Sequence, residues 1–205
     1  GVAIHEFENV VDLDIKGEKK IVKTNKTVYE ARAVIISSGS RYREVGVPGE
    51  KEFRGRGVSY CGICDGPFFK NKRVLVVGGG NSAVITALYI TELASELKVA
   101  HRKEELRAEE ALVNALKRKN NVEILWNTEL KEIKGEKLVS KVILSNNKTG
   151  ETKELPVDGV FVQVGEDPNS GLAKEAGVAV NEEGFIIIDR LQRTNTEGVY
   201  AAGDV

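Results

Sequence analysis

The sequence contains no methionine, only two cysteines and only four prolines among its 205 residues. Both cysteines lie in one Cys-x-x-Cys segment, so the dispersed cysteine framework of a small secreted disulfide protein is excluded. No apolar run approaches the roughly 20 residues that a bilayer-spanning helix needs. Because no methionine precedes Gly1 and the sequence stops at Gly-Asp-Val directly after an apolar run, we interpret it as a fragment of a longer polypeptide.

The sequence also has almost no net charge. Thirty lysines and arginines face 31 aspartates and glutamates, which gives a formal net charge of −1. No global basic field is therefore available to attract nucleic acid or an anionic membrane surface. Hydrophobic residues make up 41% and charged residues 30%, a balance typical of a globular protein, and the length allows one or two domains.

The first 40 residues have the pattern of short β-strands. Apolar and acidic residues alternate over residues 11–15, and further short strands are expected around residues 21–22 and 27–29. The continuous apolar run at 33–36 predicts a strand buried on both faces. The stretch from Arg41 to Gly57 is rich in glycine and charge, and we interpret it as a linker.

A second unit has the order β-α-β-α-β. Strands are expected over residues 73–77, 97–100 and 122–125, separated by helical apolar spacing over 83–94 and 108–116. Shorter strands over 130–133, 138–144 and 153–155 suggest a meander, and 158–164 a last buried strand. The prediction is an α/β fold: a Rossmann-like parallel sheet with right-handed crossovers and a β-meander. Two further apolar runs follow at 185–188 and 199–202.

A glycine-rich turn, Gly78-x-Gly80-x-x-Ala83, stands between the predicted strand at 73–77 and the helix that follows. This is the context of a dinucleotide-binding loop, in which backbone N–H groups at the helix start face a pyrophosphate. Asn81 or Ser82 is expected to cap that helix. The alternative is a glycine-rich turn that binds nothing.

Cations follow the second strand of this unit. An NAD site would place an acid there, to bind the ribose 2′-hydroxyl. Instead the sequence has His101-Arg102-Lys103, with Arg107 one turn further on. Such cations suit a 2′-phosphate and favour NADP over NAD. The alternative is a solvated charge run, because four glutamates follow closely.

The two cysteines form the segment Cys61-Gly62-Ile63-Cys64-Asp65. Two thiols at this spacing can close a disulfide and reopen it by exchange. The adjoining Asp65 can act as proton donor and acceptor if burial raises its pKa. The alternatives are inert core thiols or half of a zinc site, for which the only other soft ligands, His5 and His101, lie in separate units.

Together these motifs resemble low-molecular-weight thioredoxin reductase. The resemblance includes Cys61-x-x-Cys64-Asp65-Gly66, the glycine turn running to Val84, His101-Arg102-Lys103, and a closing Gly198–Val205 that is similar to the second FAD motif of that family. It covers essentially the whole chain, with the motifs in the family's order. One departure is Ile85-Thr86, where many members carry an acidic residue.

The resemblance implies a flavoenzyme that passes electrons from NADPH to FAD, then to the cysteine pair and on to thioredoxin. Cys64 would face the flavin, Cys61 would attack the thioredoxin disulfide, and Asp65 would be the general acid. The implied cofactor residues fall into two groups. For NADP they are Gly78, Gly79, Gly80, Asn81, Ser82, Ala83, His101, Arg102, Lys103, Arg107 and Gly165. For FAD they are Ser38, Gly39, Gly203 and Asp204.

The resemblance also implies domains that rotate about two hinges, near residues 49–56 and 165–170. Residues 1–52 and 166–205 would be parts of an FAD-binding domain, and 53–165 the NADP-binding and redox domain. A cytoplasmic location and a homodimer are expected. Two alternatives remain: a disulfide reductase for a peroxiredoxin or glutaredoxin-like partner, and a non-catalytic NADP(H)-sensing module.

Overall fold

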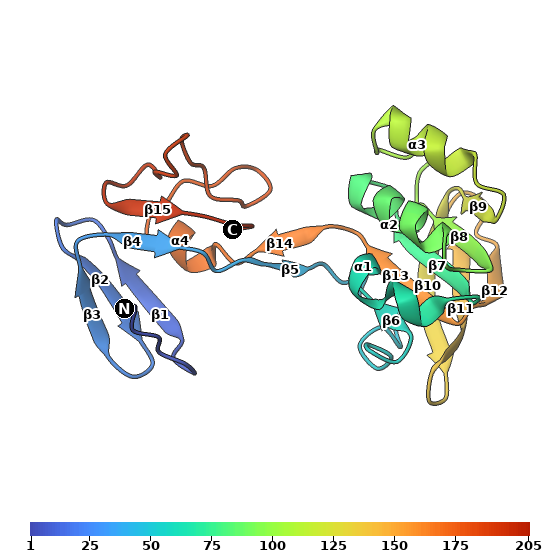
Figure 1. Cartoon of the computed structure of the whole chain (residues 1–205), viewed down its shortest axis with the longest axis horizontal. Coiled ribbons are helices and arrows are strands. Elements are labelled where there is room, and N and C mark those ends of the chain that lie inside the picture. Colours follow the sequence, from blue (N-terminus) through green and yellow to red (C-terminus); the bar gives the residue numbers. More distant parts are fainter. The chain divides into compact units, whose positions relative to one another are not determined.

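The computed structural model describes all 205 residues, which form two compact units. Unit 1 consists of residues 1–41 and 166–205, and unit 2 of residues 42–165 (Figure 1). The sequence placed the first boundary at 52/53, eleven residues later. Residues 42–52 pack into unit 2 because Glu50 is buried there and accepts hydrogen bonds from Val45 N (3.0 Å), Gly46 N (2.7 Å) and Tyr60 OH (2.9 Å).

A five-stranded parallel sheet forms the centre of unit 2. Its strand order is β6-β13-β7-β8-β9. The bounds are β6 (Val58–Ser59), β7 (Arg73–Gly78), β8 (Glu96–Ala100), β9 (Val122–Leu125) and β13 (Gly159–Gln163). The predicted β-α-β-α-β order is confirmed, and β13 enters between β6 and β7, with apolar side chains buried on both faces.

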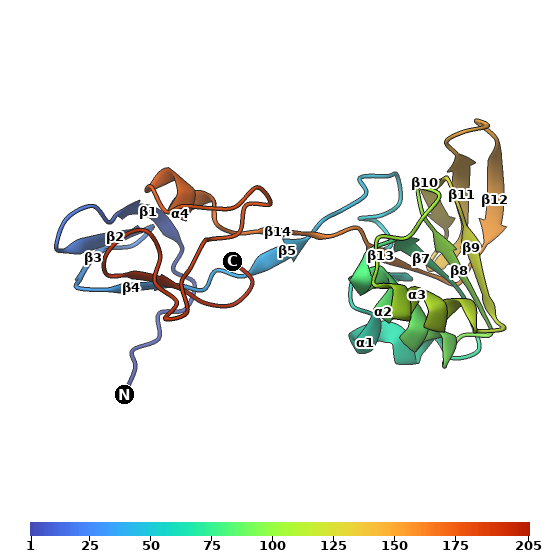
Figure 2. The same cartoon turned by 90° about the horizontal axis from the view of Figure 1, so that it is seen from above.

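Two different layers cover the faces of this sheet (Figure 2). One layer is helical: α1 (Gly62–Asp65), η1 (Gly66–Phe69), α2 (Asn81–Thr91) and α3 (Glu110–Lys117). The other is the predicted meander, an antiparallel sheet of β10 (Thr128–Gly135), β11 (Val139–Asn146) and β12 (Thr152–Pro156). Successive side chains of a strand point to opposite faces, so β7 contributes to the core on both sides of the sheet. Val74 and Val76 face the helices, whereas Leu75 and Val77 face the meander.

Unit 1 is made of smaller pieces. An antiparallel sheet contains β1 (Val10–Asp14), β2 (Lys20–Thr24) and β3 (Val28–Ala31). Two pairs complete it: β4 (Val34–Ile36) with β15 (Val199–Ala201), and β5 (Ser40–Tyr42) with β14 (Glu166–Pro168), beside helix α4 (Gly171–Glu175). Its core of seven buried residues includes Ile15 and Val199.

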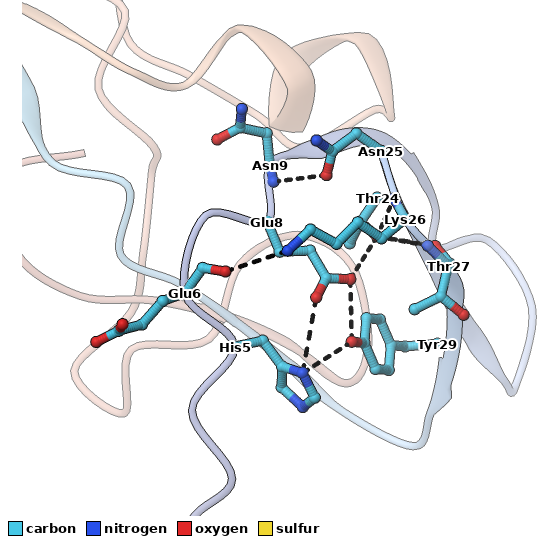
Figure 3. Close-up of polar contacts among 9 residues, drawn as sticks. All are labelled: His5, Glu6, Glu8, Asn9, Thr24, Asn25, Lys26, Thr27 and Tyr29. Atoms are coloured by element: carbon cyan, nitrogen blue, oxygen red, sulfur yellow. Dashed lines mark hydrogen bonds and ion pairs between the residues drawn. The ribbon is translucent and has the colours of Figure 1, made fainter.

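The N-terminal segment is tied to the β2–β3 hairpin by the carboxylate of Glu8 (Figure 3). Thr24 Oγ1 donates to it at 2.6 Å and Tyr29 OH at 3.0 Å, while His5 Nδ1 lies 3.6 Å away. The hydrogen bond from Thr24, more than any other contact, lowers the pKa of Glu8. The chain before β1 is thereby held against the sheet.

One expectation for unit 1 needs correction. The run at 33–36 is not buried on both faces: its strand β4 has a single partner, β15, and Ile35 is 70% exposed. The apolar run at 185–188 contributes one isolated bridge, between Val180 and Ile186. Strand β5 overlaps the start of the linker predicted from Arg41, and its partner β14 lies in the hinge predicted at 165–170.

Candidate functional site

The glycine turn joins β7 to α2. Gly78 has a φ of 151°, and a Cβ there would lie 2.2 Å from the carbonyl oxygen of Gln163, so no side chain fits. The expected side-chain cap is absent: the helix begins at Asn81 with Gly80 before it. Asn81 bonds instead with Glu109, through Nδ2 to Oε1 (3.1 Å) and from Glu109 N to Oδ1 (2.8 Å). The first N–H groups of α2 are thus left without a side-chain acceptor.

A cavity of about 550 Å³ opens beside this turn, within unit 2. It gathers most of the residues that the sequence assigned to a nucleotide site. Among its lining residues are Gly78, Gly79, Gly80, Ser82, Ala83, His101, Arg102, Arg107 and Gly165. Asn81 and Lys103 do not line it.

His101 differs from its expected role as one of a group of cations. It is 4% exposed and its ring lies under Gly79, where a Cβ would come within 2.2 Å of Nδ1. Burial above all, and then the neighbouring cations, lowers the pKa of His101, so the ring is neutral at physiological pH. Its Nε2 is buried without any hydrogen-bond partner. An orphaned polar atom in a cavity wall is a position where a ligand can supply the missing partner.

Positive charge at the cavity comes from Arg102 and Arg107, whose side chains are exposed, and from Arg43 and Lys131, which also line it. The backbone N of Arg107 donates to Gly79 O at 2.7 Å, which anchors this loop to the glycine turn. The cavity therefore joins a glycine cradle to three arginines, of which Arg102 and Arg107 lie beside the glycine turn, a combination suited to a phosphorylated ligand.

The cysteines are joined in a Cys61–Cys64 disulfide across α1. Cys64 is exposed and Cys61 is half-buried, which rules out a pair of inert core thiols. Their place is set by a glycine between them: a Cβ on Gly62 would lie 2.7 Å from Thr86 Cγ2, so only glycine lets α1 dock this closely on α2. The half-buried Asp65 ends the helix, and its N–H donates to Cys61 O at 3.1 Å.

Sequence reasoning missed a connection between the cavity and the disulfide. Gln163, at the end of β13, lines the cavity and donates from Nε2 to Tyr60 O at 2.7 Å, one residue before Cys61. Tyr60 is buried, and burial together with its hydrogen bond to Glu50 raises its pKa. The position of Gln163 at the carboxyl end of a predicted strand was the available signal.

In unit 1, the residues expected near a flavin meet at one edge of the β4–β15 pair. Ile36 pairs with Ala201 in a parallel register, so the segments that follow each strand emerge together. Ser38 is held there by Asn169, which the sequence did not single out. Ser38 Oγ donates to Asn169 O (2.8 Å), Asn169 Nδ2 to Ser38 O (3.0 Å) and Asn169 N to Gly39 O (2.9 Å). Gly203 and Asp204 are exposed at the same edge.

None of the helices combines the length and the apolar character required to cross a bilayer. No group of three or more His, Cys, Asp or Glu side chains is placed to hold a metal ion.

Known proteins match this chain over nearly its whole length. The thioredoxin reductase of Bacillus subtilis is 46% identical over 189 residues, and that of Treponema pallidum 41% over 199 residues. These matches cover 92% and 97% of the chain but only 60% and 64% of the relatives. The crystal structure of Lactococcus lactis thioredoxin reductase in its FR conformation superposes with a TM-score of 0.84 at 37% identity, over 96% of this chain and 65% of that one.

The match to a family is equally extensive. The description "Pyridine nucleotide-disulphide oxidoreductase" applies to residues 1–205, which is the whole sequence. The parallel sheet, the glycine turn and the disulfide all lie within that range. The chain belongs to the pyridine nucleotide-disulphide oxidoreductase family.

Proposed function

We propose that the full-length protein is an NADPH-dependent thioredoxin reductase that uses FAD. The observation that carries this proposal is the exposed Cys61–Cys64 disulfide docked on the same helix, α2, whose N-terminus opens the glycine-lined cavity. A redox pair and a nucleotide site thereby share one rigid element. The named relatives are thioredoxin reductases, and they support this assignment.

The cavity residues fit a pyridine nucleotide. Gly78, Gly79 and Gly80 would cradle its pyrophosphate against the first N–H groups of α2, and the orphaned His101 Nε2 would gain a polar partner. Arg102 and Arg107 would bind the 2′-phosphate, with Lys103 adding charge from outside the cavity wall. The bound nucleotide would supply a hydride, and the role of these side chains is to select and hold it.

The edge of the β4–β15 pair fits one end of a flavin nucleotide. Ser38 and Gly39 are fixed by Asn169, while Asp204 presents an exposed carboxylate that can bind ligand hydroxyls. Carboxyl ends of adjacent parallel strands are where α/β folds place such ligands. We assign Ser38, Gly39, Gly203 and Asp204 to FAD, which would relay two electrons.

The cysteines and Asp65 complete the reaction with a balanced exchange. After two electrons and one proton have opened the disulfide, Cys61 is a thiolate and Cys64 a thiol. The Cys61 thiolate attacks the disulfide of the partner, which forms a mixed disulfide and releases one partner sulfur as a thiolate that takes its proton from Asp65. The Cys64 sulfur then attacks Cys61 Sγ and gives up its own proton to the second partner sulfur as that sulfur leaves, which re-forms Cys61–Cys64 and releases the partner as a dithiol. Asp65 is the group that we place as proton donor, since it follows Cys64 directly in the chain and its N–H bonds to Cys61 O. Cys64 takes the flavin-facing role.

Partner and setting are part of the same proposal. A thioredoxin is the partner best supported by the relatives' names, and a peroxiredoxin or glutaredoxin-like protein is the alternative. A reductase of disulfides works in a reducing compartment, so we place it in the cytoplasm. We also propose a homodimer for the full-length protein.

The test is a side-by-side assay of the full-length protein with NADPH or NADH and a thioredoxin. A yellow protein that reduces thioredoxin faster with NADPH is expected. A Cys64→Ser variant should lose disulfide reduction and keep NADPH-to-flavin transfer. A colourless full-length protein would contradict the flavoenzyme assignment, and a yellow protein without thioredoxin turnover would point to the sensing module.

A further inference from the structure

The turn between β11 and β12, residues 146–150, reaches the loop that carries Arg102. This phosphate loop, residues 102–105, follows β8 and is exposed along its whole length. At its far side it is anchored by Arg107 N to Gly79 O. The backbone oxygens of Arg102 and Lys103 accept hydrogen bonds from Asn147, in the turn between β11 and β12, and from Asn127, directly before β10.

Asn146 builds the turn by itself. Its Oδ1 accepts from Lys148 N (2.9 Å) and Thr149 N (3.1 Å), and its backbone O accepts from Gly150 N (2.8 Å). The side chain of the next residue, Asn147, is therefore not needed to form the turn. It is free to make contacts outside it.

Those contacts are with two residues of the cavity wall. Asn147 Nδ2 donates to Arg102 O at 2.8 Å and to Glu129 Oε1 at 3.4 Å, and both Arg102 and Glu129 line the cavity whereas Asn147 does not. Its backbone N donates to Asn127 O at 2.7 Å, and Asn127 N donates in turn to Lys103 O at 3.2 Å. The Asn147 side chain thus holds the backbone of Arg102, whereas the backbone of Lys103 is held by Asn127.

The carboxylate of Glu129 bonds to Lys131 and Asn147 and forms no ion pair with Arg102. The hydrogen bond from Lys131 (2.7 Å), followed by that from Asn147, lowers the pKa of Glu129. A free Glu129 carboxylate would be a competitor for the Arg102 guanidinium. Asn147 and Lys131 satisfy it, which leaves Arg102 available to a ligand.

We propose that Asn147 is a positioning residue that sets the preference of the cavity for a 2′-phosphorylated nucleotide. The inference rests on the proposed function, in which NADPH is the electron donor. A guanidinium fork gives affinity only where its backbone is already held, because ordering it on binding costs conformational entropy. Asn147 touches no nucleotide and acts through Arg102 and Glu129.

The expected size follows from one hydrogen bond. A net contribution of about 1 kcal/mol corresponds to roughly a fivefold change in affinity. The KM for NADPH should therefore rise about fivefold in Asn147→Ala, with kcat unchanged and with little change in the KM for NADH. Asn147→Asp keeps the shape of the side chain, loses the N–H donor and places a second carboxylate beside Glu129. Its KM for NADPH should rise at least as much.

The experiment uses the full-length protein and two nucleotides that carry no hydride, adenosine 2′,5′-bisphosphate and ADP, titrated by calorimetry. Asn147→Ala should weaken only the 2′-phosphorylated ligand. Thr149→Ala is the matched control, because Thr149 Oγ1 accepts only from Glu151 N (3.3 Å) within the same turn. Lys148→Ala, which removes an exposed ion pair with Glu104, should change binding by less than about twofold.

Two results would overturn the inference alone: unchanged binding of the bisphosphate by both Asn147 variants, or equal losses for both ligands, which would indicate a merely structural role. A wild-type protein that binds both ligands equally would instead overturn the choice of NADPH in the proposed function. Equal melting temperatures of the variants show that any loss is local.

Discussion

The two units bury their apolar residues to very different extents. In unit 2, layers on both faces enclose the parallel sheet, and its two clusters contain all of the buried apolar side chains of the central strands. Unit 1 has 81 of the 205 residues but ten of the fifteen exposed large hydrophobic residues. These are Val2, Ile4, Phe7, Val10, Val11, Val28, Ile35, Ile187, Ile188 and Leu191. Burial, and with it the main stabilising contribution, is concentrated in unit 2.

Separating the units should produce the largest effect. Residues 42–165 expressed alone should fold and unfold cooperatively, because both faces of the sheet remain covered. Residues 1–41 joined to 166–205 should not, because seven buried residues form too small a core. Urea titration with Trp126 fluorescence follows unit 2, and amide dispersion in NMR spectra follows both. Independent folding of the unit 1 polypeptide would remove the contrast.

Truncation of one core side chain in each unit should produce the second-largest effect. Phe161 is fully buried and packs edge-to-face on Phe69, with ring centroids 5.2 Å apart. Phe161→Ala should lower the free energy of unfolding by about 3–5 kcal/mol. Ile15→Ala in unit 1, also at a fully buried position, should cost about 2 kcal/mol, because a looser surrounding collapses more readily. Urea unfolding measures the first loss and hydrogen exchange the second; equal losses would contradict the comparison.

The sequence predicted the fold of unit 2 better than that of unit 1. Unit 2 was predictable because its signals are local: buried runs, helical spacing and a glycine turn all agree. In unit 1 the apolar run around Ile35 has the same local pattern as a buried strand, yet the strand it forms pairs only with β15 and Ile35 is 70% exposed. Burial of a strand face is a tertiary property that no window of sequence contains.

The site shows the same limit. The glycine turn, the arginines and the cysteines are motifs with a chemical reason for their spacing, and the structure brings them into one unit. Asn147, Asn169 and Gln163 act through contacts to residues 18 or more positions away, and only Gln163, at the carboxyl end of a predicted strand, had a local signal. The neutral, buried state of His101 likewise depends on Gly79 lying over its ring.

A substitution of Glu50 tests whether residues 42–52 pack as part of unit 2. Its carboxylate is 1% exposed and accepts from two backbone N–H groups and Tyr60 OH. Glu50→Gln should lower the free energy of unfolding by about 2 kcal/mol, because an amide has one acceptor oxygen and leaves donors unsatisfied. Glu52→Gln, exposed and two residues away, should change it by less than about 0.5 kcal/mol. Faster tryptic cleavage at Lys51 in the Glu50 variant alone would show that the segment is released, whereas equal cleavage would return it to the status of a linker.

The smallest effect concerns the two histidines, one in each unit. His101 is buried and its pKa is lowered, mainly by burial, whereas the side chain of His5 in unit 1 is 54% exposed. Between the unfolded pKa of about 6.5 and the lower folded pKa, the unfolded chain binds more protons than the native one. Stability of unit 2 should therefore decline as the pH falls from 7.5 to 5.5, seen as a lower urea midpoint in Trp126 fluorescence. His101→Gln should flatten this dependence and His5→Gln should leave it intact. A slope that survives in His101→Gln would place the titrating group elsewhere in unit 2, because the cost of charging the buried His101 ring is the physical reason for expecting this dependence.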